Sequence, residues 1–494
     1  MHGPPSVRRA LRAASVAASV SFLLAVPAVA QTDSGWEQYQ GDAARTGSAV
    51  QGPEPPYRVQ WEREAGIGTP EDLTGFPMPI VVGDLVVVVG RESVDAVDVS
   101  DGAQVWSTER ALGPSVPAAA ARTADGTVIV VTEGGGEADA TPAETPSSTS
   151  SPAATASPTT DLETSSVLLG LDAETGERLW ESPLPDLSRT GATVLGDRAI
   201  VGTDGGDVVA VDVTTGDQVW VTAAGDQVVL PLAAAGDLVL APTATDEVAG
   251  SAALVGLEIA DGDEAWRHTS PGAATAVGSP SVARDVAFVA LGDRTVEALR
   301  LSDGSVLWSS SMNQVGILPP VILEDLVVTV DGSGQVFAFD PVSGERLWDH
   351  ALNLGVFGPP VAVPDAILVP GDGGTIASLD PDTGDLIFRT TIVDGYLLGV
   401  AVAQDTVAAT VTGPAPGLIG ITHDDDGSLV RVPSPTIMNL PALLGLWVVA
   451  AVPLTALLWF IGRWLWASLG PIDVPTGDDP DLIDADTASE GSAS

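Results

Sequence analysis

Histidine, cysteine and clustered carboxylates are the side chains from which most catalytic and metal sites are built. The sequence contains no cysteine, which excludes disulfides, thiolate metal sites and cysteine nucleophiles. Three of its four histidines, His268, His350 and His423, lie beyond residue 30. His268 and His350 each follow a tryptophan by two residues, which predicts equivalent positions on the outer strands of two separate repeats. We therefore expect no shared metal site and no Ser/His/Asp constellation from these histidines.

Two short acidic stretches could bind calcium in principle. They are "HDDDG", His423 to Gly427, and "GDGG", Gly371 to Gly374. Neither has the alternating ligand order of a twelve-residue calcium loop, so both are expected to be hydrated turns. The sequence also lacks a phosphate-binding glycine loop, zinc-ligand spacing and a nucleophile elbow. We accordingly predict no catalytic, cofactor-binding or metal-binding residue.

The charge balance restricts the possible partners. The chain has 494 residues and a formal net charge of -46, and all 20 of its cationic residues are arginines. Such a surface repels nucleic acid and anionic lipid, so a DNA or RNA partner is not expected. Its carboxylates fit an exported protein kept soluble by charge, or else a protein that has a specific basic partner or serves as a cation reservoir. With 45% hydrophobic residues, the chain can still bury a substantial core.

A repeat of about 40 residues organises the middle of the chain. A turn glycine is followed four residues later by an aromatic residue in seven copies: Gly102/Trp106, Gly176/Trp180, Gly216/Trp220, Gly262/Trp266, Gly304/Trp308, Gly344/Trp348 and Gly384/Phe388. In an eighth, degraded copy Gly427 is followed by Arg431. Successive glycines are 74, 40, 46, 42, 40, 40 and 43 residues apart. This period, with several short strands in each unit, is typical of β-propeller blades.

Each repeat predicts four strands and a defined turn. An Asp commonly ends the strand before the turn and can accept backbone N–H bonds there, while the glycine supplies a positive φ. The tryptophan of the next strand is large enough to fill the wedge between blades. We expect an all-β propeller of about eight four-stranded blades, with seven as the alternative if the last unit, 390–432, does not complete a sheet. The strand "YRVQWERE" around Trp61 would pair with the last blade and close the ring.

The 74-residue interval is explained by an insertion. Residues 133–166 are rich in Ser, Thr, Pro, Ala and Gly, which cannot build a core, so they predict a disordered loop between two strands of the second blade. It is either a tolerated insertion or a glycosylated spacer or contact arm.

The two ends of the chain predict export and membrane anchoring. Residues 1–30 combine arginines, an apolar run and a small-x-small sequence at Ala28 to Ala30, as in a signal peptide. Residues 31–432 would form the ectodomain, and 438–466 a single transmembrane helix, since Leu440 to Ile461 is nearly all apolar. The acidic residues 467–494 would form a disordered tail in the cytoplasm, either solvated or docking a basic partner. The predicted location is the cell membrane, with the propeller outside.

The sequence of the repeat resembles that of the pyrroloquinoline quinone (PQQ) type β-propellers. "LDAETGERLW", "VDVTTGDQVW", "FDPVSGERLW" and "LDPDTGDLIF" are similar to that family's repeat, and "GWEQYQGDAARTG", Gly35 to Gly47, resembles the opening of its domains. The resemblance implies that each repeat aromatic makes the tryptophan-docking contact between adjacent blades. Its enzyme branch uses PQQ and Ca2+ held by carboxylates and asparagines, with a catalytic aspartate and often adjacent cysteines. Here the only asparagines are Asn313, Asn353 and Asn439, and none has a matching local motif.

Two functions remain open. The favoured one is a non-enzymatic, membrane-anchored binding or assembly scaffold for a protein or cell-envelope ligand, with no cofactor. The alternative is a diverged PQQ-dependent dehydrogenase acting on alcohols or sugars, with PQQ and Ca2+. The enzyme would need convergent Glu, Asn and Asp side chains at the central funnel and a flat side chain against the quinone.

Overall fold

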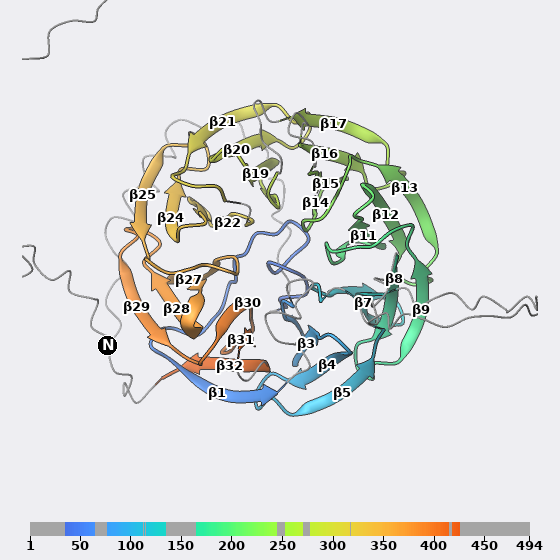
Figure 1. Ribbon diagram of the computed structural model, residues 1–494, viewed down its shortest axis with the longest axis horizontal. Coiled ribbons are helices and arrows are strands. Elements are labelled where there is room, and N and C mark those ends of the chain that lie inside the picture. Colours follow the sequence, from blue (N-terminus) through green and yellow to red (C-terminus); the bar gives the residue numbers. More distant parts are fainter. Residues whose placement is uncertain are drawn as a thin grey trace, which may run out of the picture. The chain divides into compact units, whose positions relative to one another are not determined.

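The computed structural model describes residues 35–64, 77–111, 113, 115–134, 165–244, 252–269, 277–316, 318–413 and 417–424. These residues form eight four-stranded antiparallel sheets arranged as blades around a common centre (Figure 1). The predicted β-propeller is therefore confirmed, and the number of blades is eight. The predicted signal peptide, transmembrane helix and acidic tail lie outside the described residues, as does the separate unit Val432–Ser494.

In seven blades the four strands follow one another in sequence from the centre to the rim. Blade 1 contains β2 (Ile80–Val82), β3 (Leu85–Val89), β4 (Ser93–Asp98) and β5 (Gln104–Glu109); blade 2 contains β6 (Ala119–Thr123), β7 (Gly126–Gly134), β8 (Ser166–Asp172) and β9 (Arg178–Pro183). Blade 3 contains β10 (Thr193–Leu195), β11 (Arg198–Gly202), β12 (Asp207–Asp212) and β13 (Gln218–Ala223); blade 4 contains β14 (Ala233–Ala235), β15 (Leu238–Pro242), β16 (Ala253–Glu258) and β17 (Glu264–Thr269).

The remaining blades complete the ring. Blade 5 contains β18 (Ser281–Ala283), β19 (Val286–Ala290), β20 (Thr295–Arg300) and β21 (Val306–Ser311); blade 6 contains β22 (Val321–Ile322), β23 (Val327–Val330), β24 (Gln335–Phe339) and β25 (Arg346–Ala351). Blade 7 contains β26 (Val361–Val363), β27 (Ala366–Pro370), the 3-10 turn η1 (Asp372–Gly374), β28 (Thr375–Leu379) and β29 (Leu386–Thr391). Blade 8 contains β30 (Tyr396–Val402), β31 (Val407–Thr412), β32 (Gly417–His423) and, as its outer strand, β1 (Tyr57–Glu64).

Blade 8 joins the two ends of the described chain. β1 pairs antiparallel with β32, from Tyr57 opposite His423 to Glu64 opposite Gly417. The predicted closure by the strand around Trp61 is thus confirmed, and β1 supplies the outer strand that the degraded eighth repeat would otherwise have to provide. Gly427 and Arg431 of that repeat lie outside the described residues.

The hydrophobic core lies between the blades rather than at the centre of the ring. Each apolar cluster joins neighbouring blades; one, for example, brings Val130 of blade 2 together with Val209 of blade 3 around Trp180. Since a blade is covered on both faces, its second and third strands are buried almost throughout, as in β3, β15 and β28.

The rim tryptophans connect each blade to the next. Trp61, Trp106, Trp180, Trp220, Trp266, Trp308 and Trp348 each lie over the turn glycine of the next blade, where an added Cβ would approach the ring to 2.5–2.8 Å. Each indole N–H also donates to the carbonyl three residues before that glycine, at 2.7–3.0 Å. The Phe388 side chain has no N–H, and it instead packs edge-to-face on Tyr57 of β1, with ring centroids 5.8 Å apart.

The predicted turn chemistry is also present. The seven repeat glycines from Gly102 to Gly384 all have φ between +66° and +80°. Asp172 Oδ1, for example, accepts hydrogen bonds from the backbone N–H groups of Glu174 and Thr175. At the equivalent Asp98, hydrogen bonds from the hydroxyl and the backbone N–H of Ser100 hold the carboxyl pKa below its usual value.

The topology gives the ring two different faces. The turns between the first and second strands of every blade, and between the third and fourth strands of blades 1 to 7, lie on one face, which we call the turn face. The turns between the second and third strands and the connections from blade to blade lie on the other, which we call the loop face. The predicted insertion connects the loop-face ends of β7 and β8, and its residues 135–164 lie outside the described residues. The two strands extend into the predicted range, to Gly134 and from Ser166, because the β7–β8 pairing continues to that point.

Candidate functional site

The residues singled out in the sequence do not form a common site. In the part of the chain that the structure describes, no group of three or more His, Asp or Glu side chains is arranged to hold a metal ion. His268 lies on β17 and bonds Glu297 of the next blade, with Nε2 and Oε2 2.8 Å apart. His350 lies on β25, in the equivalent position predicted for it. His423 ends β32, and its Nδ1 donates to the carbonyl of Glu54 at 2.8 Å.

The remaining candidates are equally separate. Asn313 and Asn353 are exposed on the connections that follow β21 and β25, and Asn439 is outside the described residues. The "GDGG" stretch forms the η1 turn of blade 7 on the loop face. Of "HDDDG", only His423 and Asp424 are described.

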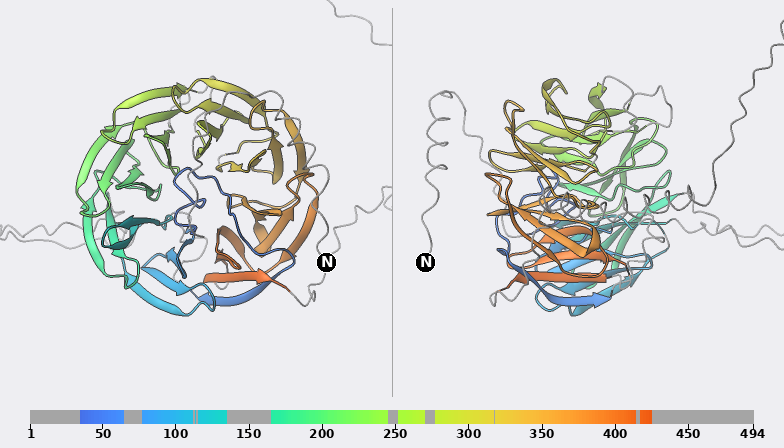
Figure 2. Two further views of the ribbon diagram at one scale, coloured as in Figure 1. Left: turned by 180° about the vertical axis from the view of Figure 1, so that it is seen from behind. Right: turned by 60° about the vertical axis from the view of Figure 1, so that its left-hand side comes forward.

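The centre of the ring is occupied by the chain itself. Residues 36–49, which precede β1, run through the middle of the propeller and contact the innermost strand of one blade after another (Figures 1 and 2). We call them the central segment. The carbonyls of Trp36, Glu37, Ala43, Ala44, Thr46 and Gly47 accept, in that order, the N–H groups of Val81, Ala120, Ala234, Val282, Ile322 and Ala362, at distances of 2.6–2.8 Å. Blade 3 uses the Gln38 side chain instead, since its Oε1 accepts from Val194 N–H at 2.8 Å.

These contacts are equivalent around the ring. All seven N–H donors belong to the second residue of the inner strand of blades 1 to 7. An inner strand is the edge of its sheet, and its unpaired N–H groups need acceptors. The central segment supplies one acceptor to each of these seven blades, so it acts as a common edge partner.

A buried arginine fixes the turn of the central segment. The Arg45 side chain is fully buried and donates to the carbonyls of Tyr39 and Leu232 at 2.6 and 2.8 Å and to Thr193 Oγ1 at 2.6 Å. The guanidinium also lies over the Tyr39 ring, 5.3 Å from its centroid. Burial lowers the pKa of Arg45 to about 10, an effect that Tyr39 and Asp42 oppose. Burial likewise raises the pKa of the Tyr39 phenol well above its usual value.

The residues around this centre do not fit a quinone held by Ca2+. Such a site needs six to eight oxygen ligands, including carboxylates, that converge on the ion. Here the carbonyls of the central segment already accept N–H groups, and the fully buried charged side chain is the cation Arg45. Among the described acidic residues of the segment, Asp42 accepts from the N–H and hydroxyl of Thr46, and Glu37 pairs with Arg122.

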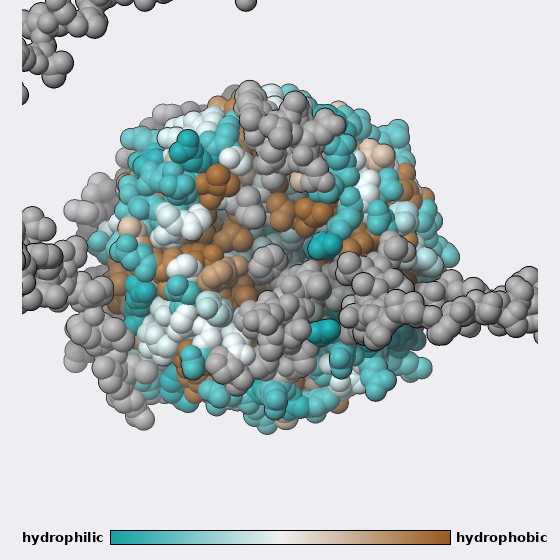
Figure 3. All heavy atoms as spheres, in the orientation of Figure 1, coloured by the Kyte–Doolittle hydropathy of each residue, from teal (hydrophilic) through white to brown (hydrophobic). Residues whose placement is uncertain are grey.

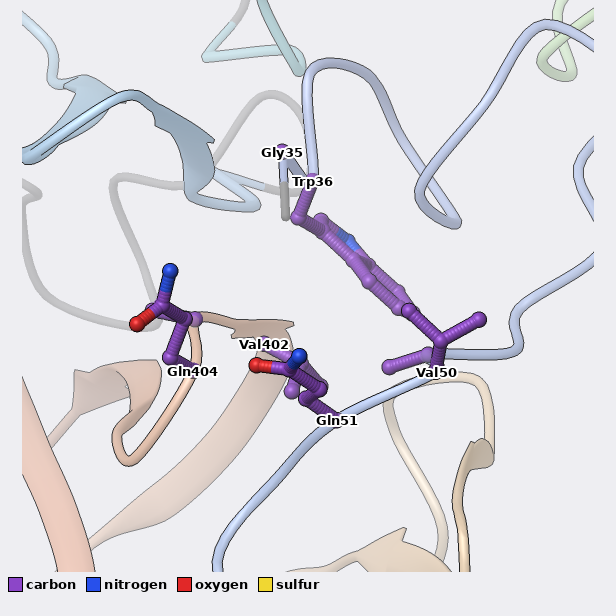
Figure 4. Close-up of a pocket in the computed structure, with 8 residues that line it drawn as sticks. Gly35, Trp36, Val50, Gln51, Val402 and Gln404 are labelled. Carbon is purple, nitrogen blue, oxygen red and sulfur yellow. The ribbon is translucent and has the colours of Figure 1, made fainter. Parts of the chain in front are cut away.

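A shallow pocket opens beside the central segment on the turn face. It measures about 340 Å³ including its open mouth, and it lies between the start of the segment and the end of β30 (Figure 4). The Trp36 indole reaches toward Val50, and Gln51 and Gln404 lie on the opposite side. The lining contains two amides and no carboxylate, so it offers hydrogen bonds but no charge to a ligand.

Sequence reasoning missed the role of the central segment. "GWEQYQGDAARTG" resembles the opening of PQQ-type domains, but it has no strand or helix period from which a place at the centre could be predicted. The available signal was Arg45 itself, because it stands among small residues in a chain with few cations.

Comparisons with known proteins agree with this architecture. The family model described as outer membrane protein assembly factor BamB (PQQ_2) matches residues 56–160, 163–316, 293–411 and 332–432. No curated protein matches the sequence at a significant level.

The solved structures that resemble the chain include BamB and alcohol dehydrogenases. BamB from Moraxella catarrhalis is 19% identical, with a TM-score of 0.54 and coverage of 76% of this chain and 100% of that one. A quinohemoprotein alcohol dehydrogenase, ADHIIG from Pseudomonas putida HK5, is 12% identical, with a TM-score of 0.61 and coverage of 81% and 82%. At these identities the similarity shows the fold alone. Within the described ranges, no helix has both the length and the hydropathy needed to span a membrane.

Proposed function

We propose that this chain, which belongs to the PQQ_2 family described as outer membrane protein assembly factor BamB, is a non-enzymatic binding or assembly scaffold for a protein partner. The observation that carries the proposal is the central segment. Residues 36–49 fill the middle of the ring and place the Arg45 cation there, where the dehydrogenase alternative requires converging carboxylates. The central region is thus used for structure, and the loops remain for recognition.

The tryptophan contacts support the same role. We interpret the seven indole N–H bonds between blades as the tryptophan-docking contacts implied by the family resemblance. They make the ring a rigid frame in which a loop can change without loss of the core. A rigid frame presents its loops in a fixed geometry, which lowers the entropy cost of binding.

The cellular location of the protein is also part of the proposal. A signal peptide at 1–30 and a single helix at 438–466 would place the propeller outside the cell membrane and residues 467–494 inside. Protease added to intact cells should then remove the propeller and spare the tail. A protected propeller with a digested tail would refute this topology.

Calorimetric titration of the purified protein with PQQ in the presence of Ca2+ tests the scaffold proposal against the dehydrogenase alternative. We expect no saturable heat. One-to-one binding in the micromolar range or tighter would overturn the proposal and justify a screen of alcohols and sugars. A parallel cross-linking experiment on intact cells, with the purified complex identified by mass spectrometry, should recover a specific protein partner.

A further inference from the structure

Two aromatic side chains stand apart from all others in the described part of the chain. Phe357 and Tyr396 are exposed, at 43% and 41%, whereas every other described Phe, Tyr and Trp is buried or half-buried. The two rings pack edge-to-face, with centroids 5.3 Å apart and planes at 81°. Exposed aromatics that cluster are typical of the energetic centres of protein interfaces.

The pair lies on the loop face, where blades 6, 7 and 8 meet. Phe357 is in the connection between β25 and β26, and Tyr396 begins β30. The two connections are tied to the η1 turn between them, since Asp372 N–H donates to the Gly355 carbonyl at 2.8 Å and Leu397 N–H donates to the Gly371 carbonyl at 3.3 Å. The two rings are therefore held on a common backbone frame and need little ordering on binding.

Two acidic residues lie near the aromatic pair in the structure or in the sequence. Asp394 is exposed two residues before Tyr396, and Asp372 belongs to the "GDGG" turn. Asp372 and Phe357 both lie close to Gly355: a Cβ added at this glycine would be 3.0 Å from Asp372 Oδ2 and 3.4 Å from Phe357 Cε2. Within the described residues, neither Asp372 nor Asp394 forms an ion pair with its side chain.

The face of the propeller that is seen in Figure 1 carries both apolar and polar surface. Hydrophobic side chains gather toward the centre of the face, and hydrophilic ones cover most of the rim (Figure 3). Apolar surface surrounded by a polar rim is the usual anatomy of a protein interface.

We propose that Phe357, Tyr396, Asp372 and Asp394 form a docking surface for an extended, arginine- or lysine-bearing segment of a partner protein. The aliphatic stem of a basic side chain packs against the two rings, and its charged head pairs with a carboxylate. The net charge of -46 favours approach of such a partner and repels an acidic one. This inference rests on the proposed scaffold function and names the chemistry of the partner.

Selection from a random heptapeptide phage library tests the proposal. The full-length protein in detergent serves as bait, at physiological ionic strength, with counter-selection against the variant Phe357→Ser/Tyr396→Ser. We expect enrichment of peptides that carry Arg or Lys. The best peptide should then bind Phe357→Ser/Tyr396→Ser and Asp372→Asn/Asp394→Asn at least about tenfold more weakly than wild type in fluorescence anisotropy.

A charge-matched control separates this surface from general attraction to an acidic protein. Asp84→Asn/Asp237→Asn removes two exposed carboxylates from the turn face and should change the affinity less than about twofold. Equal weakening by this control overturns the proposal, as do enriched peptides without basic residues or a lack of enrichment. Self-association of the wild-type protein that the Phe357→Ser/Tyr396→Ser variant abolishes also overturns it, because the occupant would then be a second copy.

The failure of this surface is distinguishable from the failure of the scaffold function. If Phe357→Ser/Tyr396→Ser still cross-links to the same cellular partner as wild type, the scaffold stands and the docking surface lies elsewhere. If PQQ and Ca2+ bind instead, the scaffold function itself falls.

Discussion

At the scale of single residues, the most unusual side chain is Arg45. It is a cation buried without a carboxylate at hydrogen-bond distance, and its charge is spread over acceptors from the central segment, from blade 3 and from the connection between blades 3 and 4. This arrangement explains why an arginine is needed, since only a planar fork of donors reaches acceptors in several directions at once.

Replacement of Arg45 should therefore cost much stability. We expect Arg45→Met to lower the free energy of unfolding by about 3 kcal/mol, because it leaves the buried carbonyl of Tyr39 without a donor and removes one of the two donors to the carbonyl of Leu232. Urea unfolding followed by tryptophan fluorescence measures the change. Arg58→Met, at an exposed arginine on β1, is the control and should stay within about 0.5 kcal/mol. Equal losses in the two variants would show that Arg45 has no special role.

Tyr57 predicts how stability depends on alkaline pH. Burial raises its pKa from 10.0 to about 12, so the folded state keeps a proton that the unfolded chain releases earlier. The resulting stability is fully present below pH 10 and is lost as the pH rises through about 12. Tyr57→Phe should remove this part of the pH dependence. The chain has only three tyrosines, so absorbance titration of wild type and variant can detect the missing phenol. The prediction is wrong if the phenol that is missing from Tyr57→Phe titrates near pH 10 in the folded wild-type protein.

At the scale of elements, the blade pattern could be predicted well from sequence, because it depends on local chemistry. The Gly-to-Trp spacing reports a turn and the strand that follows it, and both are fixed within a few residues. The outer strand of blade 8 was predictable for the same reason, since Trp61 carries the aromatic of a repeat whose other strands lie at the far end of the chain. Glycines such as Gly420 could not be predicted in this way, because glycine is required there only by the tryptophan that packs against it.

Ring closure should be sensitive to a single methyl group. Gly420 on β32 faces Trp61 on β1, and an added Cβ would meet the indole at 2.2 Å. We expect Gly420→Ala to destabilise the protein by about 1–3 kcal/mol through overpacking, although alanine normally suits a strand better than glycine. Differential scanning calorimetry checks this.

Gly332→Ala provides the matched control for Gly420→Ala. There the nearest atom to an added Cβ is a carbonyl oxygen at an ordinary 3.4 Å. We expect little change in the melting temperature. If Gly420→Ala is equally mild, then β1 and β32 are free to shift apart without cost.

At the scale of the whole molecule, the central segment could not be predicted. Its residues have no hydrophobic period, and its partners are single N–H groups on seven separate blades. Only the assembled ring brings those groups around one axis. The same reason limits what the sequence says about function: Phe357 and Tyr396 are 39 positions apart and meet because blades 7 and 8 are neighbours.

Hydrogen exchange tests the role of the central segment. Replacing residues 36–47 by a Gly/Ser sequence of equal length should speed exchange together at the seven inner-strand amides, namely Val81, Ala120, Val194, Ala234, Val282, Ile322 and Ala362. Amides of the middle strand β3 serve as the internal control and should stay protected by the blade ladder. Unchanged protection at the seven amides would contradict the proposed capping role.

The closure in blade 8 has a consequence for the timing of synthesis. Tyr57 finds its partner only when His423 has been made, roughly 370 residues later, which is about 20–70 seconds at ordinary elongation rates of 5–20 residues per second. Until then β1 has no strand to pair with, and in an incomplete chain that lacks β32 it stays unpaired. A prematurely terminated molecule therefore exposes an open sheet edge, which is the feature that proteases and chaperones recognise in unfinished proteins.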